Sequence, residues 1–384
     1  MRSCIFQKLK YIVLSLVLVA GLFCGCKNTE EEEIPVSFEE TEETISLVAF
    51  GDNLLHMPVI NSGKKDDGSY DFSHIFEKLQ PDIYNADIAV IGQETVFGGK
   101  ELGYSGYPLF NSPSDMGRTL VHEGFDVVLH ASNHVLDKLA LGVENTLAFW
   151  NEYPGVTVLG INESEMDKNT IDIIEVKGAK LALLNYTYGT NGITIPDDKS
   201  YLINLIDEEK INSDSRYAED NADFTIAFMH WGTEYSAVPD AYQKDLAQKM
   251  CDWGVDLIIG SHPHVIEPVE WIESENGNKM LVYYSLGNFV SRQKEARNLL
   301  GGMSEVTLKY DGNTVYISDY LFTPIVTHYD TTYTKFAVYK LTDYSNELAT
   351  GHGVALHDGA LSIERFKNMV DETFDNYDKS VINY

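Results

Sequence analysis

Short apolar runs, each ended by glycine or polar residues, recur along the chain from residue 45 onward. Runs of four to eight such residues are typical of buried strands, while a longer 3.6-residue apolar period is typical of helices. The predicted strands are 45–50, 87–91, 125–129, 156–159, 171–176, 180–184, 224–228, 255–259, 280–284, 306–310, 314–318 and 335–341. The predicted helices are 114–123, 136–153, 241–253 and 361–378. This alternation of strands and helices predicts an α/β fold.

Side chains that bind metals follow five of these strands within a few positions. In an open α/β sheet the carboxyl ends of the strands converge on one edge, so these side chains should share one pocket. Carboxylate, amide oxygen and imidazole together suit Mn, Fe or Zn, and the lack of cysteine argues against a structural zinc site. The residues are Asp52, His56, Glu94, Asn133, His134, His230, His262 and His264.

The stretch 256–265, DLIIGSHPHV, places two histidines directly after an apolar strand. Pro263 fixes its own φ and biases His262 towards an extended conformation, which should hold both rings in a stiff geometry. Neutral imidazole is the commonest metal ligand in proteins. A hydrogen-bonded pair of histidines in a rigid turn is equally compatible with this sequence. Both the metal-binding and the structural interpretation therefore remain open at this stretch.

The other candidates also have structural interpretations. A turn or helix cap accounts equally for Asp52, and a helix cap accounts for Asn133. Glu94 could be a surface acid, and His230, beside a tryptophan, could be a packed core residue. The Gly-Asn turn that contains Asn288 favours a structural role at the rim of the pocket.

The first 25 residues have the form of a lipoprotein signal peptide. Basic residues precede an apolar run at 11–23, which is too short for a comfortable membrane span and ends in Cys24-Gly25-Cys26. Gly25 is the small residue that cleavage requires, so Cys26 is the expected lipidated residue, with an uncleaved anchor as the alternative. Residues 26–44 are rich in Glu and Thr and predict a disordered acidic tether before a domain at 45–384.

The chain of 384 residues carries 28 Lys and Arg against 59 Asp and Glu, a net charge of −31. This acidity argues against binding of nucleic acid, which requires cationic contacts to phosphates. It also repels anionic substrates unless a cation in the site reverses the local field. After cleavage and lipidation only Cys251 would remain as a free cysteine, which excludes an intramolecular disulfide framework and suits a buried packing role.

Six motifs in order, GDNLLH, ETVFGG, ASNHVLD, HWGTEY, GSHPHVIEPVE and YSLGNFV, resemble the bacterial capsule-synthesis CapA family. That family includes poly-γ-glutamate synthesis proteins and is similar to the calcineurin-like metallophosphoesterases. The resemblance covers a core at 45–290 and implies that strands and a helix at 291–384 complete the same domain. It also implies a four-layer αββα sandwich with a metal centre at one edge.

The resemblance further implies roles for individual residues. Glu94 would bridge two divalent ions, His134 would assist the leaving group, and Asp137 on the next helical turn could orient His134. The usual Asp-x-His opening has leucine at residue 54, and Gln93, Ser132 and His130 also depart from the family pattern, which leaves the number of metals and the hydrolytic competence open. The implied metal ligands are Asp52, Glu94, Asn133, His230, His262 and His264, and further candidates for metal or substrate contact are His56, Glu234 and Asn288.

The expected function is that of an extracytoplasmic, membrane-anchored lipoprotein in the synthesis, release or export of an anionic capsule polymer such as poly-γ-glutamate. Membrane subunits of a capsule synthesis complex would be its partners. One alternative is a metal-dependent phosphatase or phosphodiesterase for an envelope or extracellular substrate. Another is a non-catalytic subunit that holds polymer at the same site.

The signal that ends in Gly25-Cys26 generates a test of the anchor. Cys26→Ser should release the protein from the membrane fraction, because a serine cannot receive the thioether-linked lipid. Fractionation with labelled lipid measures this, and lipid that still attaches to the serine variant would contradict the assignment.

Overall fold

The computed structural model describes residues 42–384, and the predicted signal peptide, Cys26 and nearly all of the predicted tether lie outside the described residues. Strand β1 (Glu43–Asn53) begins two residues before the predicted start of the domain. Glu43 and Thr44 pair with Tyr310 and Lys309 of β12, so these two tether residues belong to the sheet. The predicted start at residue 45 is therefore two residues too late, because strand pairing, not apolar character, decides where this strand starts.

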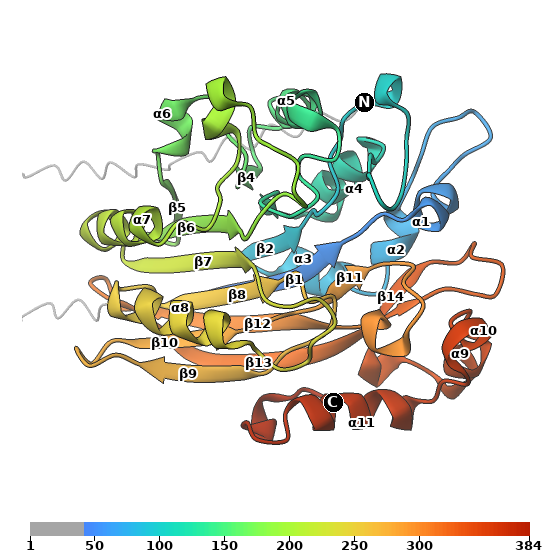
Figure 1. Ribbon diagram of the computed structural model, residues 1–384. Helices are drawn as coiled ribbons and strands as arrows, with labels where there is room; N and C mark the ends of the chain where they lie inside the picture. Colours follow the sequence, from blue (N-terminus) through green and yellow to red (C-terminus); the bar gives the residue numbers. More distant parts are fainter. Residues whose placement is uncertain (1–41) are drawn as a thin grey trace, which may run out of the picture. The chain divides into compact units, whose positions relative to one another are not determined.

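Two sheets form the centre of the structure (Figure 1). In the first sheet β1 to β4 run parallel, and the C-terminal strands pair antiparallel beside β1. In order, the first sheet contains β14 (Ala337–Lys340), β13 (Val315–His328), β12 (Leu300–Tyr310), β1, β2 (Ile88–Gly92), β3 (Val127–Leu129) and β4 (Thr157–Leu159), with β11 (Asn288–Val290) also paired to β1. In order, the second contains β5 (Asp172–Val176), β6 (Ala179–Thr187), β7 (Phe224–His230), β8 (Leu257–Ser261), β10 (Lys279–Tyr283) and β9 (Val269–Glu273).

The helices lie against these sheets and are joined to them by loops and short 3₁₀ turns. The α-helices are α1 (Met57–Ser62), α2 (Ser73–Phe76), α3 (Gln80–Asn85), α4 (Asp115–Glu123), α5 (Leu139–Trp150), α6 (Glu165–Lys168), α7 (Glu208–Asn221), α8 (Ala241–Asp252), α9 (Asn346–Gly351), α10 (Ala355–Asp358) and α11 (Ile363–Thr373). The 3₁₀ turns are Lys100–Leu102, Asp197–Leu202, Ala296–Leu299, Leu341–Asp343 and Lys379–Val381. No helix within residues 42–384 is long and apolar enough to cross a membrane.

The alternation of side chains along the strands sorts the molecule into layers. On β7, Ile226 and Phe228 face the core between the sheets, whereas Ala227 and Met229 pack with Leu246 of α8 on the outer face. Helices α2, α4 and α5 bury apolar side chains in the same cluster as the strands of the first sheet. The order helix, sheet, sheet, helix confirms the predicted αββα sandwich.

Most predicted elements are present, and the predicted strands 171–176 and 180–184, like 306–310 and 314–318, pair as antiparallel hairpins. The turn between β5 and β6 has Lys177 and Gly178 at positive φ, as a two-residue hairpin turn with a type I′ twist requires. Cys251 is buried in α8 as a free thiol, which confirms its predicted packing role. Helix α7 was not predicted, because its only fully buried apolar residues are Ile211 and Ala218.

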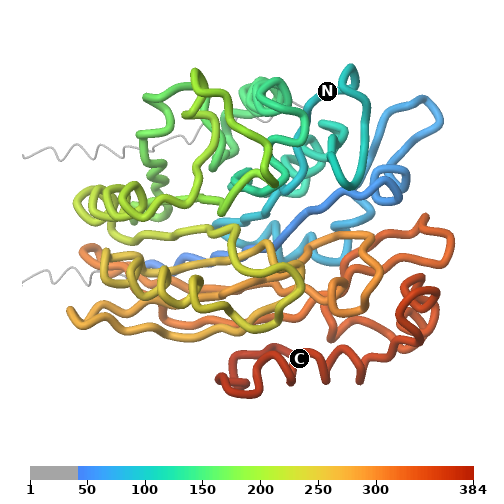
Figure 2. Tube along the Cα trace, viewed as in Figure 1, coloured from blue at the N-terminus to red at the C-terminus, as the bar shows by residue number. Residues whose placement is uncertain are grey.

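The C-terminal strands are longer than their apolar pattern predicts. Strand β12 starts at Leu300 rather than 306, and β13 continues to His328 rather than 318. Gly301, Gly302 and Pro324 interrupt the apolar pattern there, although their backbones remain in the ladder. In Figure 2 these orange strands run beside the blue β1, so the last part of the chain completes the first sheet.

Two glycines allow backbone segments to meet beneath the ends of the strands. A Cβ on Gly51 would lie 1.9 Å from the carbonyl oxygen of Gly287, and one on Gly260 would lie 1.9 Å from that of Tyr284. Since real Cβ atoms do not approach so closely, only glycine permits these contacts. The contacts bring the ends of β1 and β8 against the loop that precedes β11.

Candidate metal centre

The carboxyl ends of five strands, three from the first sheet and two from the second, meet at one edge of the sandwich. Each end carries at least one of the predicted ligand residues, and all of these side chains are buried. The structure thus brings together all six predicted ligands, whose role as ligands stays a prediction. They are Asp52 on β1, Glu94 after β2, Asn133 after β3, His230 on β7, and His262 and His264 after β8.

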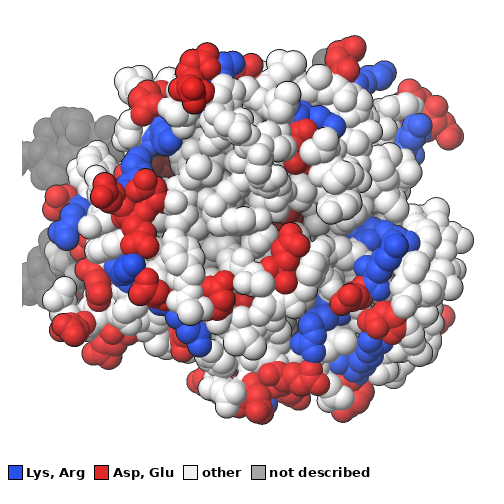
Figure 3. All heavy atoms as spheres, viewed as in Figure 1, with Lys and Arg blue, Asp and Glu red and all other residues white. Residues whose placement is uncertain are grey.

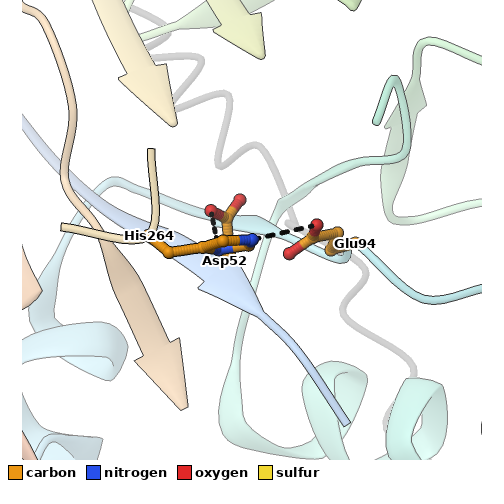
Figure 4. A group of neighbouring side chains, drawn as sticks. All are labelled: Asp52, Glu94 and His264. Carbon is orange, nitrogen blue, oxygen red and sulfur yellow. Dashed lines mark ion pairs between the residues drawn. The ribbon is translucent and has the colours of Figure 1, made fainter. Parts of the chain in front are cut away.

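Asp52, Glu94 and His264 form the inner part of this group (Figure 4). One donor atom from each residue lies within 4.8 Å of the other two. His264 lies between the carboxylates, with Nδ1 3.5 Å from Asp52 Oδ2 and Nε2 4.0 Å from Glu94 Oε1. These separations exceed hydrogen-bond length, and a cation among the three groups would contact all of them.

Asn288 determines which nitrogen of His264 faces the centre. The Asn288 amide nitrogen donates to the His264 and Asn298 carbonyls and to Gln293 Oε1, which turns Oδ1 towards His264. His264 Nδ1 lies 3.0 Å from that oxygen, closer than to Asp52, and therefore donates its proton there. Nε2 remains for the centre, an arrangement typical of metal-binding histidines. Asn288 thus orients a candidate ligand through a hydrogen bond, whereas the sequence favoured a position at the rim of the pocket.

Asn133 and His230 face each other across the two sheets. Asn133 donates to Asn191 Oδ1 at 3.1 Å, which leaves its own Oδ1 2.9 Å from His230 Nε2. The other ring nitrogen of His230 lies 3.0 Å from Ser261 Oγ. Amide oxygen and imidazole nitrogen therefore point into one small space, where a shared cation could replace their mutual hydrogen bond.

His262 corrects a prediction from the sequence. Its φ is +97°, not the extended value that Pro263 was expected to favour. Two contacts hold this strained turn: the His262 N–H donates to Asp52 Oδ2 at 3.1 Å, and the Tyr235 N–H donates to the Pro263 carbonyl at 2.8 Å. Such strain persists only where the surroundings enforce it, so tertiary contacts here outweigh the local preference of an X-Pro step.

Several buried atoms of this group that could bind a metal have no hydrogen-bond partner among the described residues. Both carboxylate oxygens of Glu94 and Nδ1 of His262 are in this state. Leaving a buried polar atom unpaired costs about 1–3 kcal/mol, and more for a charged group. Carboxylate oxygen and neutral imidazole nitrogen are both ligands for divalent cations, so the donor set fits the predicted cofactor in kind.

The charges of the group favour the same conclusion. Burial and the neighbouring Asp52 raise the pKa of Glu94, because two carboxylates cannot both ionise cheaply in a dry space. Burial opposes ionisation of Asp52 as well, but the neighbouring imidazoles of His264 and His230 lower its pKa. Burial lowers the pKa of His230 to about 4 and that of His262 to about 2, which keeps both imidazoles neutral and able to bind a metal.

His134 and Asp137 form the predicted pair beside this group. His134 Nδ1 lies 2.7 Å from Asp137 Oδ2, which also accepts the Phe110 N–H at 2.6 Å. Although burial opposes protonation of His134, the bond to Asp137 and the charge of Glu94 raise its pKa. With Nδ1 held by Asp137, Nε2 is the nitrogen left for a substrate.

The structure does not bring the two remaining candidates into the group. His56 Nδ1 accepts the backbone N–H of Arg292 at 3.3 Å, and its ring packs edge-on against Phe110. Leu54, at the position where the family pattern has histidine, is a buried core residue. Glu234 is exposed in the loop after β7. Neither His56 nor Glu234 belongs to the cluster of mutually close donor atoms.

The sequence profile of the family described as "Bacterial capsule synthesis protein PGA_cap" matches residues 46–293. This chain belongs to that family. The match contains every one of the six candidate ligands as well as His134 and Asp137, and it confirms the resemblance carried by the motifs.

Two curated relatives are similar to this chain. The PGA biosynthesis protein CapA of Bacillus subtilis is 32% identical over 206 residues, which cover 51% of this chain and 50% of that protein. The capsule biosynthesis protein CapA of Bacillus anthracis is 24% identical over 316 residues, which cover 80% of this chain and 74% of that protein. The alignment thus spans about half the length of the first relative.

Solved structures with a similar arrangement include enzymes that act on phosphate esters. The NAD nucleotidase of Haemophilus influenzae has 13% identity and a TM-score of 0.47, covering 89% of this chain and 64% of that chain. The calcineurin-like phosphoesterase YfkN of Bacillus subtilis has 14% identity and a TM-score of 0.43, covering 88% and 98%.

Three departures of this chain from the family pattern have structural explanations. Gln93 Oε1 accepts from Asn53 at 2.7 Å, beneath the centre. Ser132 Oγ donates to the Glu94 carbonyl at 2.9 Å, and His130 Nε2 accepts from Trp150 at 2.8 Å. All three side chains support neighbouring segments and leave the candidate ligands in place.

Sequence reasoning missed Tyr188 and Asn191, which follow β6. The Tyr188 ring lies 4.5 Å from that of His262, and Asn191 orients Asn133. β6 runs parallel to β7, so its end reaches the same edge as the other candidate ligands. The signal was present, because polar residues follow this strand too, but none of them is an acid or an imidazole.

Glu267 lies three residues after His264, and its backbone N–H donates to the Ser285 carbonyl at 3.0 Å. Its Oε2 accepts from Gln243 at 2.7 Å, while Oε1 has no hydrogen-bond partner within residues 42–384. The side chain is fully buried, and burial raises the pKa of Glu267 to about 8. At neutral pH this residue therefore serves as a protonated, neutral member of the core.

This raised pKa makes stability depend on pH. Between about 4.5 and about 8 the folded state keeps the Glu267 proton while the unfolded state loses it, so stability falls as pH rises through this window. Glu267→Gln removes the titrating group. As the pH rises through this window, the free energy of unfolding of the variant should therefore increase by more than about 1 kcal/mol relative to that of the wild type. Urea unfolding of chelator-treated protein measures this, with the exposed Glu275→Gln as control. Parallel pH profiles for Glu267→Gln and wild type would contradict the assignment.

Proposed function

We propose that this capsule synthesis protein is a metal-dependent hydrolase that acts on an anionic polymer of the cell envelope. The observation that carries the proposal is the pair of buried carboxylates, Asp52 and Glu94, set among three imidazoles with both Glu94 oxygens unpaired. Groups so costly to bury without partners point to a resident cation. The family and the chain's own residues together support a role in processing or release of the capsule polymer.

The proposed centre holds divalent ions through Asp52, Glu94, Asn133 and the three histidines. Bound divalent cations at such a site supply polarisation of a phosphoryl oxygen and a lower pKa for water. The positive charge would also offset the chain's net charge of −31 where an anionic substrate must approach. Two ions would be the expected occupancy, with Mn, Fe or Zn as candidates and Glu94 among the residues that would hold them.

His134 would serve as the proton donor to the leaving group. Asp137 accepts from Nδ1 and thereby orients the ring, and the raised pKa of His134 keeps the ring protonated to higher pH than a free imidazole. Phe110 packs edge-on against the same ring at 4.7 Å between centroids, which limits its rotation. The proton would leave from Nε2, the nitrogen that Asp137 does not hold.

The lipid anchor at Cys26 belongs to the same proposal, because it would hold the site next to membrane subunits that make or export polymer. A phosphatase of broader envelope function, or a subunit that only binds polymer, would use the same residues. The experiments below separate these outcomes, since the first detects the metal and the second detects turnover.

Metal content tests the centre directly. The double variant His262→Ala, His264→Ala should lose metal affinity by more than about 100-fold, because even loss of an outer hydrogen-bond partner of a ligand costs about 10–100-fold. Elemental analysis and the rise in melting temperature with added Mn²⁺ measure the loss. The matched control is His74→Ala, His122→Ala, which removes two imidazoles away from the centre. Unchanged metal content in the first variant would refute the centre.

Turnover tests His134. His134→Ala should slow hydrolysis of an alkyl phosphodiester by about 10²–10⁴-fold with metals retained, because the leaving group then lacks a proton donor. The loss should shrink for a nitrophenyl ester, whose leaving group needs no proton. Asp137→Asn should give a smaller loss of the same kind, and His122→Ala should give none.

Equal losses for both esters would show that His134 is not the acid. No turnover of any phosphoester by the metal-loaded protein would exclude a phosphoesterase and favour the polymer-binding subunit.

A further inference from the structure

A cavity of about 540 Å³ lies beside the candidate metal centre. Its walls come from the start of α1, from the loop that contains Tyr107, and from the segment that follows β11. Tyr235 forms the wall towards the centre, and its ring centroid lies 5.9 Å from that of His264. The cavity therefore begins one side chain away from a candidate ligand of the metal centre.

Arg292 is held in a defined position in this cavity. Its guanidinium carbon lies 4.5 Å from the centroid of the Tyr333 ring, and Nη2 donates to His357 Nε2 at 3.1 Å. Its backbone N–H donates to His56 Nδ1 at 3.3 Å, which ties it to the loop after β1. The next residue, Gln293, accepts from Asn288, the residue that orients His264. The loop of Arg292 is thus coupled to the centre through two hydrogen-bonded steps.

This guanidinium lacks a counter-charge. Among residues 42–384 no carboxylate forms an ion pair with Arg292, and its Nε is buried without a hydrogen-bond partner. Arg297, five positions on, pairs with Glu372 at 2.6 Å. An unpaired and partly buried cation in so acidic a chain is costly, and a guanidinium matches the oxygen pair of a carboxylate or phosphate.

The other residues of the cavity suit an extended anionic ligand. Exposed Lys294 adds a second cation, and Tyr107 and Tyr235 present exposed rings. Glu295 also lines the cavity, but it is exposed, so water and salt screen its charge more than that of the half-buried Arg292. On the face drawn in Figure 3, basic groups gather on the right, while acids are spread over the surface.

We propose that this cavity is a subsite that binds one oxyanion of an extended anionic substrate, with Arg292 as its anchor. The subsite rests on the proposed function, since it would place a neighbouring unit of the same chain at the metal centre. The shared chemistry is an oxyanion, either the carboxylate of a polyacid or the phosphate of a polyphosphodiester. The position of the subsite would let the protein select a polymer over a small monoester.

Calorimetry on the whole purified protein tests this proposal with three probes: a short γ-linked glutamate oligomer, a short glycerol phosphate oligomer, and an uncharged γ-linked glutamine oligomer. Arg292→Gln should weaken binding of one anionic oligomer by about 10–100-fold, the usual range for loss of hydrogen bonds to a charged group. Arg292→Lys should restore part of the affinity, because lysine returns the positive charge but not the paired N–H donors of the guanidinium. Arg297→Gln, which removes the same charge nearby, should change affinity by less than about threefold.

The oligomer that shows this dependence identifies the oxyanion as carboxylate or phosphate. Equal losses in Arg292→Gln and Arg297→Gln, equal binding of the uncharged oligomer, or no binding of either anion at millimolar concentration would overturn the subsite. If Arg292→Gln fails to fold, the exposed Lys294→Gln must show a severalfold loss for the proposal to stand.

Metal content measured in the same samples separates this proposal from the proposed function. Arg292-dependent binding by a protein that takes up no metal would reject the proposed function and keep the subsite. Metal uptake with binding that does not depend on Arg292 would reject the subsite alone.

Discussion

Two carboxylates buried side by side dominate the energetics of this protein. Asp52 and Glu94 are both buried, and each makes ionisation of the other more costly. Such a pair is stable only if one group keeps a proton or if positive charge sits between them. Three imidazoles and an amide oxygen surround the pair, so the site is built as a receptor for cations. The other structural features of this edge serve to place these groups.

The surrounding backbone is arranged to hold the site rigidly. Glycines at 51 and 260 let neighbouring segments touch, and the positive φ of His262 is held by hydrogen bonds from two directions. Strain of this kind costs about 1–3 kcal/mol per residue, and the large core between the sheets offsets it. Asn288 and Asn191 then orient their neighbours through hydrogen bonds. The ligand positions are therefore set before any metal binds.

Charge links the centre to its surroundings. An acidic protein that handles an anionic polymer must gather positive charge where the polymer meets it. The proposed metal ions would do so at the strand ends, and Arg292 would do so in the adjoining cavity. Since the guanidinium stacks on Tyr333 and has no acidic partner among residues 42–384, its charge is available to a ligand. The two sites together would recognise repeated negative charge rather than one phosphate.

The sequence by itself determined the α/β class and eight candidate residues at strand ends, because apolar period and polar residues at strand ends are local signals. The resemblance of its motifs to a family reduced these to six candidate ligands. The sequence could not reveal the conformation of His262, which opposes the preference before proline. Nor could it find the part of Asn288 in orienting His264, or the unpaired state of Arg292. These properties depend on contacts between residues far apart in the chain, such as that between His262 and Asp52. Only the folded backbone decides them, since packing and hydrogen bonding across the two sheets outweigh local preference.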